Sequence, residues 1–395
     1  MKKGWQTKTL GEICEIERGG SPRPIQNFIT TDPNGINWIK IGDATASGKY
    51  IHKTEEKIRP EGVKRSRMVY EGDFILSNSM SFGRPYIMKT NGCIHDGWLV
   101  LHQPKVDPDY LYHVLSSDLV FNQFDRLAAG STVRNLNIGL AKSVEIPYPP
   151  LPDQRRIVGI LDEAFDGLAR ATANAEQNLR NARALFESQL QSVFTQRGKG
   201  WQEKTLEEVS TAFGRGKSKH RPRNAPHLYG GKYPFIQTGD IRNADHIITE
   251  YSQTYSEAGL AQSKLWPKGT TCITIAANIA ETAILGFDAC FPDSVIGVVA
   301  NPKEADVGYI EYLLQSFKAR IQAMGKGSAQ ANINLGTFEH ERFPFPSVTE
   351  QQQIVAKLDS LRAETQRLES IYQQKLAALG ELKKSLLHQA FTGAL

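Results

Sequence analysis

Hydrophobic and polar residues follow two alternating patterns along the chain. In residues 1–150 and 198–346, apolar residues come in short runs such as Phe74-Ile75-Leu76, and Gly, Pro and Asn residues separate these runs. Residues 153–196 and 350–391 contain no proline and consist mostly of strong helix formers. The pattern predicts an α+β protein with two tandem mixed α/β domains, each followed by a long helix. The predicted boundaries are 1–150 for the first domain, 151–197 for the first helix, 198–346 for the second domain and 347–395 for the second helix.

The two long helical segments share one spacing of apolar positions. In the second segment these positions alternate three and four residues apart, as in a coiled-coil seam: Ile354, Leu358, Leu361, Thr365, Leu368, Tyr372, Leu379, Leu382 and Leu386. The first segment repeats the register with smaller side chains: Ile157, Leu161, Ala164, Leu168, Ala171, Ala175, Ala182, Leu185 and Gln189. The first helix leads to the second domain and the second helix returns, so the sequence predicts an antiparallel coiled coil. Packing of each helix on a foreign helix is the alternative.

Residues near the helix starts suggest how each helix begins. Pro152 suits the first turn of one helix, where its missing N–H is harmless, and Asp153 lies near the positive end. Thr349 is expected to cap the other helix, with Gln352 completing a capping box.

The chain is also an internal repeat. Gly4-Trp5-Gln6 returns as Gly200-Trp201-Gln202. Further matched pairs are Arg18 with Arg215, Cys93 with Cys290, Asp96 with Asp293, Gln154 with Gln351 and Asp162 with Asp359. A repeat of this length predicts two equivalent halves related by a pseudo-twofold axis.

Composition adds little to the functional argument, and charge adds only a weak preference. There are 47 Lys and Arg residues against 42 Asp and Glu, so the net charge of +5 mildly favours a polyanionic partner. The four cysteines form no CxxC pair, the first ten residues are polar, and no run of 18 apolar residues occurs. We therefore expect a cytoplasmic protein without bound metal and without a membrane partner.

Basic residues mark three candidate DNA-binding segments in each half. The densest stretch, residues 214–223, has no acidic residue and can follow a phosphate backbone: Arg215, Lys217, Ser218, Lys219, Arg221 and Arg223. Its counterpart in the first half holds Arg18, Ser21 and Arg23. A second cluster comprises Lys64, Arg65 and Arg67, with Lys264 in the other half. The third candidates are two Gly-Ser loops, with Ser131, Arg134 and Asn135 in one and Lys326, Ser328, Gln330 and Asn332 in the other. Solvated surface loops and ordinary turns are the alternatives.

Catalytic interpretations find less support. A DNA amino-methyltransferase needs an Asn/Asp-Pro-Pro-aromatic loop, and Pro147-Tyr148-Pro149-Pro150 has the wrong order. Asp43, Glu55 and Lys57 give a faint metal-nuclease pattern, but the second half has no matching lysine. A coiled-coil scaffold that binds only proteins would not need two equivalent basic domains. We therefore expect no catalytic residues.

The order of domain, long helix, domain and long helix resembles the specificity subunits of type I restriction-modification systems over the whole chain. The resemblance is carried by the start of the first helix, Pro149 to Ile157, by Gln352-Gln353-Ile354, and by the segments Thr9 to Ile13, Gly72 to Ser77 and Gly130 to Thr132. It implies that each domain is a target-recognition domain that reads one half of a bipartite, asymmetric DNA site. It also implies two methyltransferase subunits that use S-adenosylmethionine and restriction subunits that use ATP and Mg, joined in DNA methylation and defence against foreign DNA. This chain would bind none of those cofactors.

Overall fold

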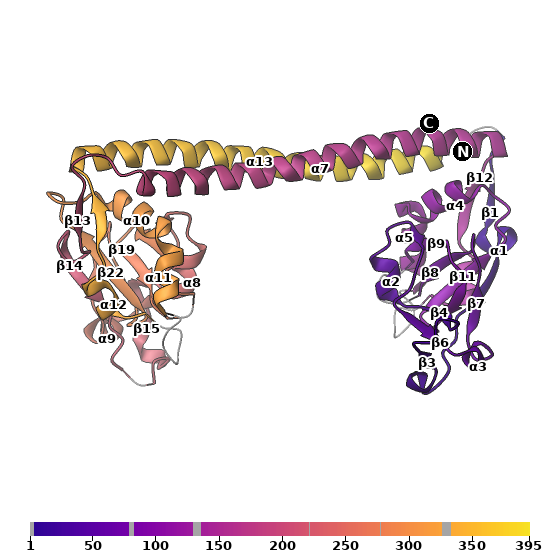
Figure 1. Ribbon diagram of the computed structural model, residues 1–395, viewed down its shortest axis with the longest axis horizontal. Helices are drawn as coiled ribbons and strands as arrows, with labels where there is room; N and C mark the ends of the chain where they lie inside the picture. Colours follow the sequence, from indigo (N-terminus) through magenta and orange to yellow (C-terminus); the bar gives the residue numbers. More distant parts are fainter. Residues whose placement is uncertain (1–3, 79–82, 129–135, 221, 277, 326–332) are drawn as a thin grey trace. The chain divides into compact units, whose positions relative to one another are not determined.

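The computed structural model describes residues 4–395 except 79–82, 129–135, 221, 277 and 326–332 (Figure 1). It divides into two compact units. Unit 1 comprises Met1–Glu176 and Gln374–Leu395, and unit 2 comprises Gln177–Gln373. Each unit therefore contains one α/β domain together with part of each long helix.

The domain of unit 1 contains two five-stranded sheets and a two-stranded sheet. The first sheet has the order β2 (Glu15–Arg18), β11 (Trp98–His102), β8 (Phe74–Ser77), β9 (Pro85–Met88), β5 (Tyr50–Ile51). The second has the order β3 (Ile29–Thr30), β6 (Glu56–Ile58), β4 (Ile36–Ile39), β10 (Gly92–Ile94), β7 (Arg67–Val69). In the third, β1 (Gln6–Thr9) pairs antiparallel with β12 (Glu145–Tyr148). The helices are α1 (Leu10–Ile13), α2 (Ile41–Thr45), α3 (Pro60–Val63), α4 (Pro108–Leu115), α5 (Asp118–Ala128) and α6 (Ile138–Lys142).

The domain of unit 2 repeats this arrangement with one strand fewer in its second sheet. Its first sheet has the order β14 (Ser210–Arg215), β22 (Val295–Ala300), β19 (Thr271–Thr274), β20 (Thr282–Leu285), β16 (Ile247–Ile248). The second has the order β17 (Gln253–Tyr255), β15 (Tyr229–Phe235), β21 (Ala289–Cys290), β18 (Leu265–Trp266), and β13 (Gln202–Lys204) pairs with β23 (Phe343–Phe345). The helices include α8 (Thr238–Asn243), α9 (Glu257–Ala261), α10 (Val307–Ser316), α11 (Lys318–Gly325) and α12 (Leu335–Glu339).

Short apolar runs form the central strands because both faces of these strands are buried. In β8, Phe74 and Leu76 point into one core, and Ile75 points into another. Alternate residues of a strand point to opposite faces, so an uninterrupted apolar run is suited to a strand covered on both sides. The predicted mixed α/β fold is therefore confirmed in both units.

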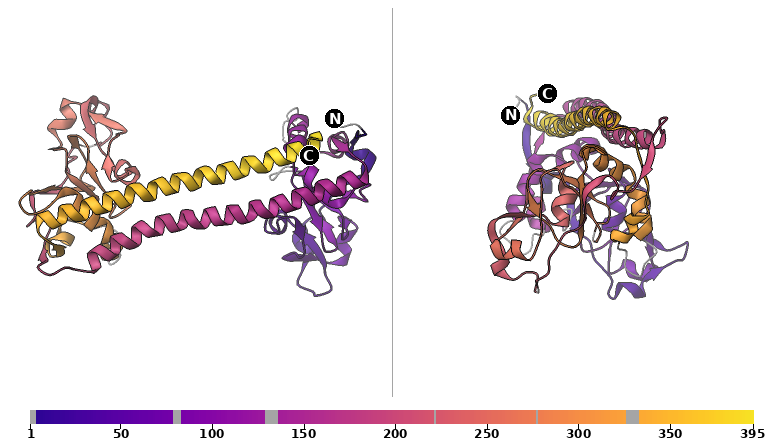
Figure 2. Two further views of the ribbon diagram at one scale, coloured as in Figure 1. Left: turned by 90° about the horizontal axis from the view of Figure 1, so that it is seen from above. Right: turned by 90° about the vertical axis from the view of Figure 1, so that its left-hand side faces the viewer.

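The long helices are α7 (Leu151–Thr195) and α13 (Val348–Thr392), and they pack on each other antiparallel. In unit 1, Leu161 near the start of α7 shares a core with Phe391 at the end of α13. In unit 2, Phe194 at the end of α7 shares a core with Leu358 near the start of α13. The first and last described residues therefore both belong to unit 1, where Trp5 and Phe391 contribute to the same core (Figure 2).

The seam positions differ from the predicted set in part. Ile157, Leu161 and Leu358 are buried. Leu168, Ile354, Leu361, Leu368, Leu379 and Leu386 are half-buried. Leu382 is 48% exposed, and Leu185 and Gln189 are also exposed, so their assignment to the seam was wrong.

The displaced positions have a physical explanation, because each helix also packs on a domain. The ring of Phe186, not Leu185, lies against Tyr312 of the domain, and Leu387, not Leu386, is buried in the core that α13 shares with the domain of unit 1. The buried face near each helix end is therefore rotated by about one residue from the ideal seam.

The predicted cap of the second helix is also corrected. The helix begins at Val348, and the Ser347 hydroxyl accepts a hydrogen bond from the Glu350 backbone N–H at 3.3 Å. Ser347, not Thr349, therefore precedes the first turn. Pro152 lies in the first turn of α7, as predicted.

Candidate nucleic-acid interface

The first basic loop, residues 18–24, follows β2, an edge strand of unit 1. The Gly19 backbone N–H donates to the Trp98 carbonyl at 2.9 Å. A Cβ atom at Gly19 would lie 2.0 Å from the His95 carbonyl oxygen, so this approach requires glycine. The loop is thereby fixed against the turn between β10 and β11.

The second basic loop, residues 215–223, is anchored in the same way in unit 2. Residue 221 lies outside the described part. The Gly216 N–H donates to the Val295 carbonyl at 2.9 Å, and a Cβ atom at Gly216 would lie 2.2 Å from the Phe291 carbonyl oxygen. Both halves therefore hold their basic loop by a glycine that touches the neighbouring turn.

Asp96 binds three polar side chains of the first basic loop. Arg18 donates its Nε–H to the Asp96 carbonyl at 3.1 Å, and the Ser21 hydroxyl donates to Asp96 Oδ1 at 2.6 Å. Arg23 Nη2 lies 3.3 Å from Asp96 Oδ2. The hydrogen bond from Ser21, with a smaller effect of the Arg23 charge, lowers the pKa of Asp96. This carboxylate therefore stays ionised and keeps the loop in place.

Asp293 has the same position in the second basic loop. Its carbonyl accepts the Nε–H of Arg215 at 2.7 Å, and Arg223 Nη2 donates to both of its carboxylate oxygens at 2.8 Å. The internal repeat already matches Asp96 with Asp293. Their role could not be seen in the sequence, because the arginines that they hold lie far away along the chain.

The other cations of the second basic loop face solvent. Lys217 and Lys219 are exposed and form no ion pair within the described residues. Lys264 lies beside them with its ammonium 3.5 Å from the Trp266 ring centre, and burial, followed by the charge of Lys217, lowers its pKa. Ser218 is buried. The structure thus brings Lys264 together with this loop, as one would expect of a single basic surface.

The cluster at residues 64–67 lies beside the first basic loop. Lys64 and Arg65 are exposed, and Arg67 forms an ion pair with Glu17 at 3.2 Å. A Cβ atom at Gly20 would lie 3.0 Å from the Arg65 carbonyl oxygen. Two basic segments that are separate in the sequence are therefore adjacent in each half. The remaining candidates lie outside the described residues: Ser131, Arg134, Asn135, Arg221, Lys326, Ser328, Gln330 and Asn332.

An open cavity of about 770 Å³ adjoins the first basic loop, and sequence reasoning missed it. Arg23, Pro24, Trp38, Lys40 and His95 contribute to its lining. The rings of Trp38 and His95 lie 6.1 Å apart, and burial lowers the pKa of His95, which favours the neutral imidazole. An apolar surface beside an arginine and a neutral imidazole can accept the methyl group of thymine or the flat face of a base.

Each domain is joined to its long helices by matching hydrogen bonds. Trp5 Nε1 donates to Asp153 at 3.2 Å, and Trp201 Nε1 donates to Glu350 at 3.0 Å. The buried Gln154 accepts from the Asp107 backbone N–H at 2.8 Å and donates to the Pro149 carbonyl. The buried Gln351 makes the equivalent bonds in unit 2. Because buried polar groups are costly to leave unpaired, these bonds fix the start of each helix on its domain.

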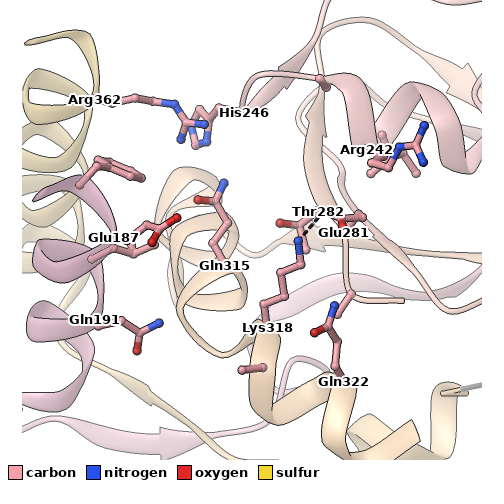
Figure 3. Close-up of a pocket in the computed structure, with 16 residues that line it drawn as sticks. Glu187, Gln191, Arg242, His246, Glu281, Thr282, Gln315, Lys318, Gln322 and Arg362 are labelled. Atoms are coloured by element: carbon pink, nitrogen blue, oxygen red, sulfur yellow. Dashed lines mark hydrogen bonds and ion pairs between the residues drawn. The ribbon is translucent and has the colours of Figure 1, made fainter. Parts of the chain in front are cut away.

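A polar pocket of about 480 Å³ lies in unit 2 between the domain and the long helices (Figure 3). Lys318 forms an ion pair with Glu281 at 2.8 Å inside it, and Arg362 and His246 lie side by side at one end. Beneath His246, the fully buried Glu311 is 2.6 Å from the ring Nδ1. Arg362 is paired with Asp245 at 2.8 Å, so the pocket contains ion pairs that lie where the domain meets both long helices.

Asp43 and Lys57, two residues of the faint nuclease pattern, make local hydrogen bonds. The Asp43 carboxylate accepts hydrogen bonds from the backbone N–H groups of Lys40 at 2.8 Å and Glu55 at 3.0 Å, and so caps α2. The Lys57 ammonium donates to the Pro33 carbonyl at 2.7 Å. These residues therefore do not converge on an open metal or water position.

The four cysteines are all buried. Burial raises the pKa of Cys14 to about 12, and it raises those of Cys93, Cys272 and Cys290. Across the residues that the structure describes, no cluster of three or more His, Cys, Asp or Glu side chains could hold a metal ion. Within the same part of the chain, no helix combines the length and the apolar character needed to cross a membrane.

Two repeated domains, each with an anchored basic loop and each attached to an antiparallel pair of long helices, define a protein with two nucleic-acid recognition modules. The family model for the type I restriction modification DNA specificity domain matches residues 2–179 and again residues 198–377. The chain belongs to this family. It is a DNA specificity subunit and not a catalytic one, as the resemblance in the sequence implies.

Individual relatives agree over the full length. The chain is 23% identical to the type I restriction enzyme EcoKI specificity subunit of Escherichia coli K12, covering 100% of this chain and 90% of that protein. It is 21% identical to the StySPI specificity subunit of Salmonella potsdam, with the same coverage.

Two solved structures share the fold. The HsdS subunit of Thermoanaerobacter tengcongensis has a TM-score of 0.66 at 20% identity and covers 100% of this chain and 98% of its own. A chain from a study of assembly and conformational transition of the type I R-M system has a TM-score of 0.83 at 20% identity and covers 100% and 99%.

Proposed function

We propose that this specificity subunit reads a bipartite, asymmetric DNA site, with one half-site for each target-recognition domain, 1–150 and 198–346. The observation that carries the proposal is the presence in both units of a basic loop held by a glycine and an aspartate. Since the two loops differ in charge and length, the two half-sites differ in sequence.

Within each domain, exposed lysines suit phosphates, while arginines and amides also suit base edges. We assign the phosphate role to Lys217, Lys219 and Lys264 in the second domain and to Lys64 and Arg65 in the first. Ser131, Arg134, Asn135, Arg221, Lys326, Ser328, Gln330 and Asn332 stay candidates on sequence grounds alone.

The long helices serve as spacer and docking surface in this proposal. Partners are double-stranded DNA, two methyltransferase subunits that use S-adenosylmethionine, and restriction subunits that use ATP and Mg, all in the cytoplasm where the DNA lies. The chain holds none of these cofactors itself. What supports the assembly is membership of a family of type I restriction-modification specificity domains.

The first test uses the complete chain with its methyltransferase partner. Methylated adenines in DNA from cells that contain both proteins give the site, and binding to a duplex with that site is then measured at several salt concentrations. In the Lys217→Ala/Lys219→Ala variant, affinity should fall for all sequences alike. The salt slope should decrease by about 0.9 for each lysine–phosphate pair that the substitutions remove.

The matched control is Lys303→Ala, which removes an exposed lysine of the same domain outside the basic loop. It should leave the slope unchanged. A wild-type complex that prefers no duplex over any other would refute the proposed function, and an unchanged slope in the double variant would assign its two lysines to bulk solvent.

A further inference from the structure

The cations of each basic loop fall into two physical kinds, which separates possible base-reading residues from phosphate-binding ones. Lys217 and Lys219 are exposed and form no ion pair among the described residues. Arg223 exposes 49% of its side chain, and both oxygens of Asp293 hold its Nη2. A mobile ammonium follows a repetitive charged backbone well, whereas a fixed planar guanidinium suits one particular partner.

The anchoring of Arg223 extends to its backbone. Its carbonyl accepts a hydrogen bond from the Tyr229 hydroxyl at 2.8 Å. The side chain and main chain are both fixed, so binding a ligand costs little rotamer freedom. Part of the positive charge is already neutralised by Asp293, which weakens the attraction to a phosphate but leaves the remaining N–H groups directed by the carboxylate.

Resting on the proposed function, we propose that Arg223 reads a guanine in the second half-site and that Asp293 is its positioning residue. The carboxylate engages Nη2, and Nε and Nη1 lie on opposite sides of the guanidinium, so Nη1 is the terminal donor that can reach a single acceptor on a base edge. Guanine presents two acceptors, O6 and N7, and no donor on its major-groove edge, while adenine places an amino donor beside its N7. One fixed donor directed at the O6 position therefore favours guanine, because adenine has an amino donor at that position.

The first domain contains the same pair in a more open form. Arg23 lies 3.3 Å from Asp96 with 80% of its side chain exposed, and Ser21 occupies the other carboxylate oxygen. Arg23 accordingly reads a guanine in the first half-site with weaker discrimination, since its geometry is less restricted.

The experiment measures the affinity of the methyltransferase complex for duplexes that change one base pair at a time. Arg223→Lys should lose discrimination at one G·C pair of the second half-site, by about ten- to a hundredfold, with the salt slope and the first half-site unchanged. Asp293→Asn should relax the same position although Arg223 is retained, a result that removal of a mere surface charge would not give. Methylated sites in cells should become degenerate at that position.

The matched control is Arg320→Lys, because Arg320 is also half-exposed, at 50%, and pairs with Glu341 at 2.7 Å in the same domain. Arg320→Lys should leave the complex able to discriminate between base pairs at every position of both half-sites. Thermal unfolding of each variant confirms the folded state, and if Asp293→Asn does not fold, Arg223→Lys carries the test alone. Full discrimination in Arg223→Lys, or a change confined to the salt slope, overturns the inference, while a wild-type complex without any sequence preference overturns the proposed function instead.

Discussion

His113 in unit 1 and Tyr312 in unit 2 are equivalent residues of different chemistry, and each forms a hydrogen bond from its domain to a long helix. In unit 1, His113 of α4 is hydrogen-bonded to Asp162 of α7 at 2.8 Å. In unit 2, the Tyr312 hydroxyl of α10 donates to Asp359 of α13 at 2.6 Å. The first tie can titrate near neutral pH, and the second cannot, since burial raises the pKa of Tyr312 further from that range.

Unit 1 should therefore lose stability in mild acid through His113. Burial lowers the pKa of His113 despite the opposing effect of Asp162, with Lys49 and Asp109 also facing the ring. The unfolded chain then binds a proton that the folded one resists, so this contribution is complete above pH about 6.5 and is lost as pH falls from there toward the folded pKa. Between pH 7.5 and 5.5, the unfolding temperature of the wild type should fall more than that of His113→Gln.

Tyr312→Phe provides the control for this pH effect. Removing its hydroxyl should lower the unfolding temperature of unit 2 by the same amount at both pH values, at a cost of about 1 kcal/mol. Parallel pH profiles for wild type and His113→Gln, measured by calorimetry, would show that His113 does not control the response.

Some residue roles could be predicted from the sequence, and others required the structure. The repeat marks Gly19 with Gly216 and Asp96 with Asp293 as equivalent, but an equivalence does not say what each residue touches. The contacts that define their roles join β2 to the β10–β11 turn in unit 1 and β14 to the β21–β22 turn in unit 2, across more than seventy positions of the chain. Short-range patterns do not contain that information.

At the level of elements, the long helices were the most predictable feature and their buried faces were less so. The absence of proline beyond the first turn and the spacing of leucines predict α7 and α13 as continuous helices, which is what the structure contains. A seam drawn for two isolated helices misses the third partner, the domain. For this reason the sequence predicts Leu382 in the buried seam although the structure shows it exposed. Leu387, five positions later, is buried in the core of unit 1.

The two leucines should therefore respond differently to truncation. Leu387→Ala removes a side chain that is only 6% exposed, and it should cost about 2–5 kcal/mol of the stability of unit 1. Leu382→Ala, on the same helix and in the same unit, should cost less than about 0.5 kcal/mol. Chemical denaturation of the two variants measures the difference in unfolding free energy. Equal losses would contradict the shift of the buried face and support the seam predicted from the sequence.

At the level of the whole molecule, one polypeptide contains two compact units that share only the long helices as continuous elements. Each helix has 45 residues, so its length is about 67 Å at 1.5 Å per residue. The hydrogen bonds of Gln154 and Gln351 fix each domain on the start of a helix. If the helices are the spacer, their length determines how many base pairs separate the half-sites, and their sequence does not affect which bases are read.

Lengthening both helices by the same amount tests this proposal. Insertion of four helix-forming residues after Glu176 in α7 and four after Gln373 in α13, at the boundary between the units, adds about 6 Å and turns the helix by about 40°. One base pair advances DNA by about 3.4 Å and turns it by about 35°, so the preferred spacer should grow by one or two base pairs. The bases read in each half-site should stay the same, because no residue of either basic loop is altered. The same insertion in α7 alone leaves the helices unequal and should lower stability instead. Methylated sites in cells that carry the doubly extended chain give the result directly, and an unaltered spacer with a folded complex would mean that the helices do not set the distance.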